Sequence, residues 1–349
     1  MGRGMRRAGG RPRRAFAAPR WIVALAVLIM SPGESPSVAA SGSGGRDAAF
    51  ALLRSLTPPQ GAGRGTVVEF GSCLWAPPPL HFSEPFARMA ERDFAAATIS
   101  SDAAAAPARL NEWIARTTRG LIPSILDRPP DPGSVVLANG IVFLGKWMVP
   151  FDPALTAPAP FHEASGRVRT APMMARAGRF RYAAVPGGQL VDLPYDDGRY
   201  SFRVFLPGER QGLEKWLERA TARSWLALGA SLEEAPGELV MPRMDLAFAA
   251  ELRPALERLG IVAAFRPGAA DFSPMTVERA PLFVGSVVHR AVVKIDEAGT
   301  TAAASTAAQM TGAAAPRASF RMVIDHPFLF AIHGAGAEDL LFLGAVRAL

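Results

Sequence analysis

The stretch "SVVLANGIVFLGKWMVPFDP", residues 134–153, contains the clearest strand signal of the chain. Its first half is apolar or small at both odd and even positions and is rich in valine, isoleucine and leucine. Because successive side chains of a strand point to opposite faces, this pattern predicts a central strand in a sheet that is covered on both sides.

Weaker signals of both kinds lie on either side of this stretch. The spacing of apolar residues predicts helices at 48–56, 109–120 and 250–260, the last two ending at a glycine. Further strands are predicted at 66–75, 188–195, 200–207, 237–246, 286–296, 326–334 and 339–346. No repeat occurs, and no linker after residue 45 divides the chain, so the sequence predicts one mixed α+β domain.

The charge of the chain is concentrated at its beginning. The 349 residues are 49% apolar and carry a net charge of +7. Residues 1–40 hold seven arginines and a single acid, Glu34, and therefore most of that charge. The remainder is close to neutral, which argues against nucleic acid as a partner.

Residues 1–40 have the anatomy of an export leader. An arginine-rich start precedes an apolar run at 21–30 and a polar stretch that ends in "SVAA" at Ala40. The apolar run is too short to span a bilayer, so no membrane association is expected once the leader is removed. We expect a secreted or periplasmic protein. The pair Arg13-Arg14 would suit the twin-arginine route, and the general secretory route stays open.

The sequence contains no recognisable catalytic or metal-binding motif. There is no G-x-S-x-G elbow, no HExxH and no P-loop, and Cys73 is the single cysteine. We therefore expect no cofactor and no metal, and we interpret Cys73 as a small core residue. A hydrolase triad stays open, since triads are defined by geometry and not by sequence order. The five histidines show no ligand-like spacing: His81, His162, His289, His326 and His333.

Several segments resemble the serpin family of serine protease inhibitors, in the order in which that family has them. "VLANGIVFLGKWMVPFDP" and the following "FHEASGRVRTAPMMARAGRFRYA" resemble the central strand of the main serpin sheet and the segment after it. "VHRAVVKIDEAGTTAAASTA" resembles the strand and hinge that lead into the reactive loop, and "DHPFLFAIHGAGAEDLLFLGAV" resembles the closing hairpin. Order and spacing hold from about Asp47 to the C-terminus.

The resemblance implies the serpin fold. We expect a large mixed main β-sheet, two further sheets, surrounding helices and an exposed reactive-centre loop. The serpin domain would span 41–349 after the leader at 1–40, with its hinge and reactive loop at about 297–318. Serpins usually begin with about eighty more residues, so we expect the first helices to be missing if the leader is real. The alternative is that "ALAVLIMSP", residues 24–32, is a remnant of the serpin start.

The resemblance also implies a function, which is inhibition and not enzymatic catalysis. In inhibitory serpins a serine protease cuts the exposed loop, and the freed limb inserts into the main sheet as a new strand. The acylated protease is carried along and is trapped as a covalent complex. We therefore expect a monomeric suicide inhibitor. The alternative is a serpin-fold binding protein that does not inhibit because its first helices are missing.

The segment from Glu297 onwards has the small side chains that insertion needs. A limb that slides between paired strands cannot carry bulky or charged residues on its inward faces. Gly299 gives the hinge backbone freedom. Alternate residues share a face: Thr300, Ala302, Ala304 and Thr306 would point one way, and Thr301, Ala303, Ser305 and Ala307 the other.

The position of the bond that the protease cuts depends on how the loop is counted. Counting from Glu297 places it between Ala313 and Ala314, which would suit an elastase-like or subtilisin-like protease. Counting back from Pro327 gives Pro316 instead. Two further candidates are Met310 and Arg317, of which Arg317 would imply a trypsin-like target.

Three matched positions are expected to govern the opening of the main sheet. Trp147 corresponds to the tryptophan near the end of the sheet where the limb first enters. Asn139 and His289 correspond to a hydrogen-bonded pair near the centre of the sheet.

Overall fold

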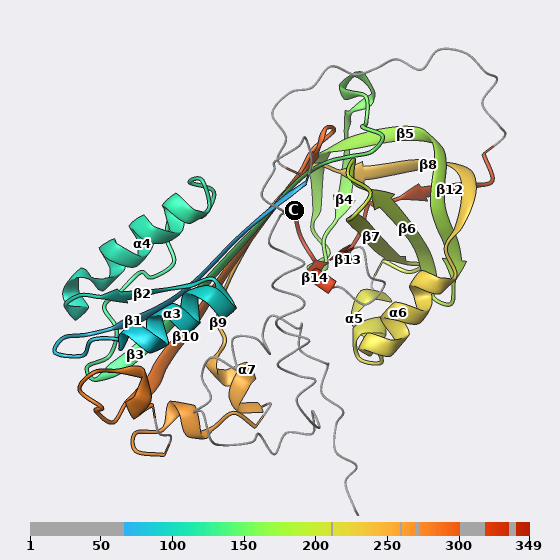
Figure 1. Ribbon diagram of the computed structural model, residues 1–349. Coiled ribbons are helices and arrows are strands. Elements are labelled where there is room, and N and C mark those ends of the chain that lie inside the picture. The colour runs from blue at the N-terminus through green and yellow to red at the C-terminus, as the bar shows by residue number, and fades with distance from the viewer. Residues whose placement is uncertain (1–65, 211, 259, 270–271, 301–317, 335–339) are drawn as a thin grey trace, which may run out of the picture.

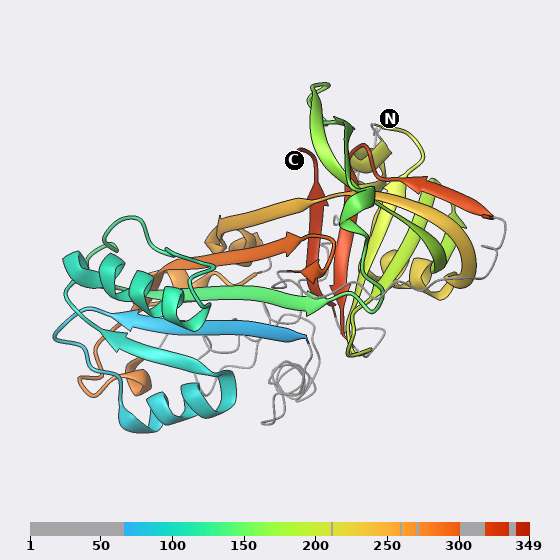
Figure 2. The same cartoon turned by 90° about the horizontal axis from the view of Figure 1, so that it is seen from above.

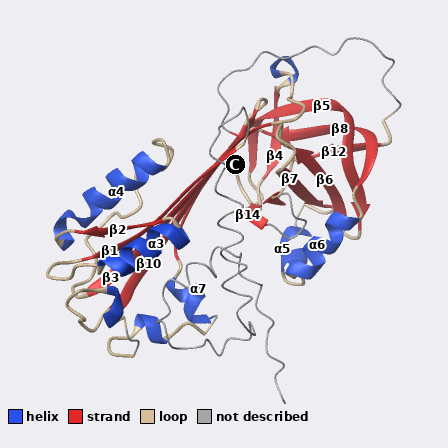
Figure 3. Cartoon of the chain, in the orientation of Figure 1, coloured by secondary structure: helices blue, strands red, loops and turns tan. Residues whose placement is uncertain are grey.

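The computed structural model describes residues 66–349 except 211, 259, 270–271, 301–317 and 335–339. The described chain has two β-sheets with helices packed against them, which is the predicted α+β class (Figures 1 and 3). The predicted leader, the predicted helix at 48–56 and the predicted reactive loop from Thr301 to Arg317 lie outside the described residues. The prediction that the first helices are missing also concerns a part of the chain outside the described residues.

The main sheet has six strands in the order β2-β1-β3-β11-β10-β9. β3 runs parallel to β10 and antiparallel to β1, while β9 is antiparallel to β10. In Figure 2 these strands lie side by side and run along the long dimension of the molecule. Their bounds are β1 Val67–Ala76, β2 Ala96–Ser100, β3 Ser134–Lys146, β9 Met244–Glu251, β10 Phe283–Ile295 and β11 Gly299–Thr300.

β3 is a central strand with both faces covered, as its apolar pattern predicts. Every residue from Ser134 to Phe143 is buried. One face packs under α4 (Ala106–Thr117), whose Leu110, Trp113 and Ile114 form the buried stripe. The opposite face packs partly against a cluster beneath α7 (Arg253–Arg258) and α3 (Glu84–Phe94) and partly against the second sheet.

The second sheet has eight strands, seven of them in the order β12-β8-β5-β6-β7-β13-β14, with β4 paired to β5. Two further sheets were expected; the strands form one continuous sheet because β5, 18 residues long, runs through both halves. The bounds are β4 Ala157–His162, β5 Val168–Val185, β6 Gly188–Pro194, β7 Ser201–Pro207, β8 Glu233–Pro242, β12 Phe320–Val323, β13 Phe328–His333 and β14 Leu340–Val346.

Helices α5 (Gly212–Leu217) and α6 (Ala222–Ala230) pack against the second sheet. Thr221 caps α6 through a reciprocal pair of hydrogen bonds with Ser224. Short 3-10 helices complete the described chain: η1 Ala103–Ala105, η2 Pro153–Leu155, η3 Ala263–Phe265 and η4 Ser273–Met275.

Two sequence predictions need correction. The single strand predicted at 237–246 is two strands, because the chain leaves the second sheet at Pro242 and enters the main sheet at Met244. The helix predicted at 250–260 is only Arg253–Arg258, because β9 continues to Glu251 to pair with β10. Within the described part of the chain, no helix is long and apolar enough to cross a membrane.

Candidate functional site

The hinge begins with a tight turn at the end of β10. The Asp296 carboxylate accepts hydrogen bonds from the backbone N–H groups of Ala298 (2.9 Å) and Gly299 (3.1 Å). Gly299 has a φ of 150°, and a Cβ at this position would lie 2.1 Å from the carbonyl oxygen of Gly145. Only glycine fits this turn, because any side chain would collide with the backbone of β3.

After the turn, two residues enter the main sheet between β3 and β10. Thr300 pairs with Ile295 of β10 on one side and with Gly145 of β3 on the other, antiparallel to both. Its side chain is fully buried, and its hydroxyl lies 2.7 Å from that of Tyr195. β11 is therefore the beginning of an additional strand inside the sheet.

Beyond Thr300, towards the centre of the sheet, β3 and β10 pair directly with each other. Their parallel register runs from Ser134 opposite Phe283 to Val142 opposite Val292. A strand longer than β11 could occupy this seam only if β3 and β10 separated. We call the line along which they pair the β3–β10 seam.

Trp147 lies at the end of β3, over the hinge turn. Its indole stacks on Tyr195, with ring centroids 4.8 Å apart, and donates a hydrogen bond to the carbonyl oxygen of Asp296 (2.9 Å). The backbone N–H of Trp147 donates to the carbonyl of Ala298 (2.9 Å). Tyr195 is fully buried, and this burial raises the pKa of its phenol. The stacked rings of Trp147 and Tyr195 therefore pack against the hinge where it enters the sheet.

Glu297 anchors the hinge from the other side. The residue is 7% exposed, and its carboxylate accepts hydrogen bonds from the guanidinium of Arg243 and the hydroxyl of Thr156, both at 2.5 Å. Burial raises the pKa of Glu297, but the hydrogen bonds from Arg243 and Thr156 outweigh it and leave the pKa below its ordinary value. The carboxylate therefore stays ionised and ties the hinge to the junction between β8 and β9.

Asn139 and His289 meet at the middle of the seam. Their backbones are opposite one another, and Nδ1 of His289 lies 2.8 Å from Oδ1 of Asn139. The amide nitrogen of Asn139 donates to Ser72 (2.9 Å), so its oxygen accepts and His289 carries a proton on Nδ1. Burial lowers the pKa of His289 to about 4. The ring is neutral at pH 7 and is held across the seam.

The structure thus places Glu297, Gly299, Thr300 and Trp147 together at one end of the sheet, and Asn139 with His289 near its centre. The other predicted hinge residues, Thr301 to Thr306, lie outside the described residues, as do the proposed bond at Ala313 and Ala314 and the alternatives Met310, Pro316 and Arg317.

Three residues that contact the hinge were not predicted from the sequence: Tyr195, Arg243 and Thr156. Each contacts the hinge from a segment 54 to 141 residues away in the chain. The one available signal was Tyr195, the aromatic residue that ends the strand predicted at 188–195.

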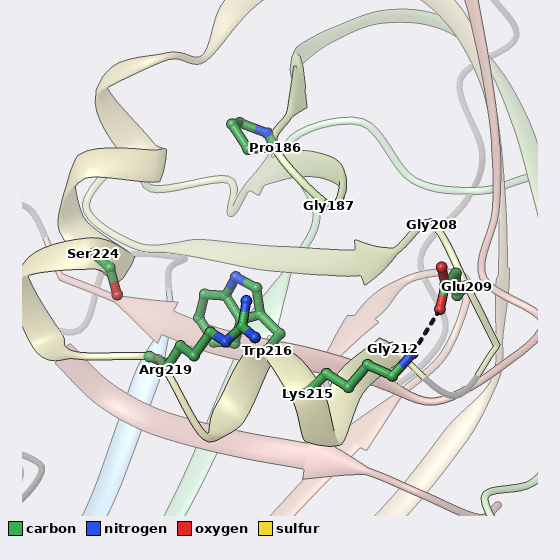
Figure 4. A pocket seen from close by; sticks show the side chains of 10 residues that line it. Pro186, Gly187, Gly208, Glu209, Gly212, Lys215, Trp216, Arg219 and Ser224 are labelled. Atoms are coloured by element: carbon green, nitrogen blue, oxygen red, sulfur yellow. Dashed lines mark hydrogen bonds and ion pairs between the residues drawn. The ribbon is translucent and has the colours of Figure 1, made fainter.

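A pocket of about 650 Å³ lies away from the hinge, between the β5–β6 turn and helices α5 and α6 (Figure 4). Trp216, Arg219 and the ion pair between Lys215 and Glu209 (3.2 Å) line it. None of the predicted site residues lines this pocket. In the part of the chain that the structure describes, no group of His, Cys, Asp and Glu could hold a metal ion.

Comparison with known proteins assigns the fold. A family model described as "Serpin (serine protease inhibitor)" matches residues 46–349. Putative serpin-Z6C of Oryza sativa subsp. japonica is 34% identical over 340 residues, covering 84% of this chain and 79% of the relative. Plasminogen activator inhibitor 1 of Mus musculus is 31% identical over 248 residues, which cover 68% of this chain and 60% of the relative.

Among solved structures, uncleaved ovalbumin superimposes with a TM-score of 0.79 at 23% identity, over 95% of this chain and 91% of that one. At this identity the likeness concerns the fold.

Proposed function

The chain belongs to the serpin family, a family described as serine protease inhibitors and not as enzymes, and from this premise we propose that it is a suicide inhibitor of serine proteases. A protease would cut the reactive loop, and the freed limb would insert between β3 and β10. The 31% identity to a protein named as an inhibitor of plasminogen activator supports inhibition over binding alone.

The observation that carries this proposal is the position of β11. Thr300 already pairs with both β3 and β10, and Gly299 pairs with Lys146 of β3, so insertion would extend an existing strand instead of starting a new one. It would replace direct parallel pairing of β3 with β10 by two antiparallel ladders, and antiparallel pairing is slightly more stable per residue. Ten to fifteen added hydrogen bonds, at about 1 kcal/mol net each, would release roughly 10 to 15 kcal/mol.

The register of β11 fixes where each residue of an inserted limb would lie. Thr300 is opposite Gly145 of β3 and Ile295 of β10. A limb that kept this register would bring Thr306 opposite both Asn139 and His289. Insertion would therefore separate that hydrogen-bonded pair, and the small threonine hydroxyl could bond to either side chain.

The direct test is a gel after incubation with a panel of elastase, subtilisin and trypsin. We expect a protease adduct that survives boiling in detergent. Mass spectrometry of the products would locate the cut, expected between Ala313 and Ala314, with Met310, Pro316 and Arg317 as the alternatives. Cleaved loop without adduct for all three proteases would contradict the proposal.

Two substitutions in the hinge should convert the inhibitor into a substrate. Thr300→Arg would force a charge into the buried position beside Tyr195, and Ala304→Pro would remove a ladder hydrogen bond. The measurement is the ratio of adduct to cleaved protein. An adduct yield equal to that of the parent protein would contradict insertion.

The loop would be cut outside the cell. The arginine-rich start and apolar run in residues 1–40 support export to the periplasm or the medium, and we propose that the mature inhibitor acts there as a monomer. Cell fractionation with N-terminal sequencing would test this. Recovery in the cytoplasm of a chain that still carries residues 1–40 would contradict export.

A further inference from the structure

The segment that follows α4, residues 118–127, crosses the face of the main sheet before the chain enters β3. We call it the strap. Asn111 of α4 holds it with three hydrogen bonds: its oxygen accepts from the N–H groups of Ile125 (2.7 Å) and Leu126 (2.9 Å), and its amide donates to the carbonyl of Leu126 (2.9 Å). Thr118 closes the start of the strap by accepting from the N–H of Ile122 (3.1 Å).

The strap packs on both strands that flank the seam. Its buried side chains share one cluster with Val136 and Val142 of β3 and Val292 of β10: Ile122, Ile125 and Leu126. On the β3 side it is also covalently connected, since residues 128–133 lead from the strap to Ser134 at the start of β3. It also fits closely there, because a Cβ on Gly140 would lie 3.2 Å from the end of Ile122.

On the β10 side, an ion pair between Asp127 and Arg290 connects the strap to the strand. Arg290 donates from one guanidinium nitrogen to both carboxylate oxygens of Asp127, at 3.0 and 3.2 Å. Arg290 is opposite Gly140 of β3 in the parallel register. The pair therefore joins the segment attached to β3 directly to β10, across the seam.

We propose that the Asp127–Arg290 ion pair restrains the opening of the β3–β10 seam and so limits the rate at which a cut loop inserts. Insertion would place one more strand between β3 and β10 and increase their separation by roughly 4.8 Å. An ion pair of 3.0 Å cannot span that increase unless the strap lifts from the sheet. The kinetic part of this inference rests on the proposed function.

The expected effect is modest, because Asp127 is 76% exposed and Arg290 27% exposed. Exposed ion pairs of this kind change equilibria and rates by about two- to fivefold. Asp127→Asn and Arg290→Gln should each raise the opening rate by about that factor, and combining them should add little. Exchanging the charges, Asp127→Arg with Arg290→Asp, should restore the parent rate.

Segment-resolved hydrogen exchange of the uncut, full-length protein measures seam opening directly. We expect faster exchange in segments 134–142 and 284–292 of the single variants. The matched control is the ion pair between Lys294 and Asp245 (3.1 Å), which joins β10 to β9. These two strands would stay paired during insertion, so Lys294→Gln should leave exchange at the seam unchanged.

A second measurement follows the rate of loop insertion after cutting with subtilisin, by the change in tryptophan fluorescence. Unchanged exchange in Asp127→Asn and Arg290→Gln, or an equal change in Lys294→Gln, would overturn the restraint. If the parent protein inserted no loop, the proposed function and the kinetic role would both fail. Exchange would then still decide whether the ion pair holds the seam.

Discussion

At the scale of single residues, the buried, neutral His289 at the centre of the sheet makes the stability of the protein depend on pH. Burial lowers its pKa to about 4, whereas an unfolded histidine has a pKa near 6.5. The unfolded chain therefore binds the proton more readily, so stability is fully present above about pH 6.5 and is lost as the pH falls towards 4.

When the pH falls from 7 to 5, protonation of His289 in the unfolded chain should lower the free energy of unfolding by about 2 kcal/mol. Urea unfolding at both pH values would measure this loss, and His289→Gln should reduce it by about that amount. His333, whose pKa burial also lowers to about 4, supplies the background loss in both proteins. An equal pH dependence in the variant would show that His289 is not the group that titrates.

The Glu297–Arg243 pair gives a second prediction at this scale. Arg243→Gln would leave the buried carboxylate with the hydroxyl of Thr156 as its remaining side-chain donor. A lost hydrogen bond to a charged group costs about 1.5 to 3 kcal/mol, so thermal unfolding should begin at lower temperature. Arg321→Gln, which removes an exposed pair with Glu238, is the control and should have little effect.

The residues that could be predicted from sequence are those that the hinge itself carries. Glu297, Gly299 and Thr300 stand in one short segment whose small side chains have a clear physical purpose. Tyr195 follows β6 and Arg243 lies between β8 and β9, so their contact with the hinge depends on which strands become neighbours. Periodicity and composition hold no information about that pairing.

At the scale of elements, β3 and α4 were predictable because their patterns are long and unambiguous. The path from β8 to β9 was not. The apolar alternation continues through Pro242 and Arg243, so the sequence looks like one strand although its halves belong to different sheets. A change of sheet depends on tertiary contacts, which override local preference.

The contact between α4 and β3 can be tested through Gly140. A Cβ at this position would lie 2.4 Å from Cδ1 of Ile114, so Gly140→Ala should push α4 away from the sheet. Overpacking of this kind costs about 1 to 3 kcal/mol, which a shift of the urea midpoint would measure. Ile114→Val removes the colliding atom, and the double variant should recover most of the loss. Additive losses would mean that the collision is relieved elsewhere.

At the scale of the whole molecule, the hinge has already entered a sheet whose seam is otherwise closed, and the proposed function requires that this arrangement store free energy. The native arrangement leaves β3 and β10 paired in parallel, while a further antiparallel strand would pair with both. The strap, the Asn139–His289 pair and the Glu297 anchor all act across or beside the seam. Under the proposed function, the native state would persist because the barrier to loop insertion is high, and not because it has the lowest free energy.

Cutting the reactive loop should therefore make the protein more stable, although it breaks the chain. With roughly 10 to 15 kcal/mol released, and 1 kcal/mol worth about 2 to 4 °C in a domain of this size, the melting temperature should rise by more than about 20 °C. Calorimetry before and after limited cutting with subtilisin measures this rise. Ala304→Pro is the matched control, because its loop is cut in the same way but its limb cannot complete the ladder. A parent protein whose melting temperature stays unchanged after cutting would be a serpin that binds without inserting, the alternative function considered for this chain.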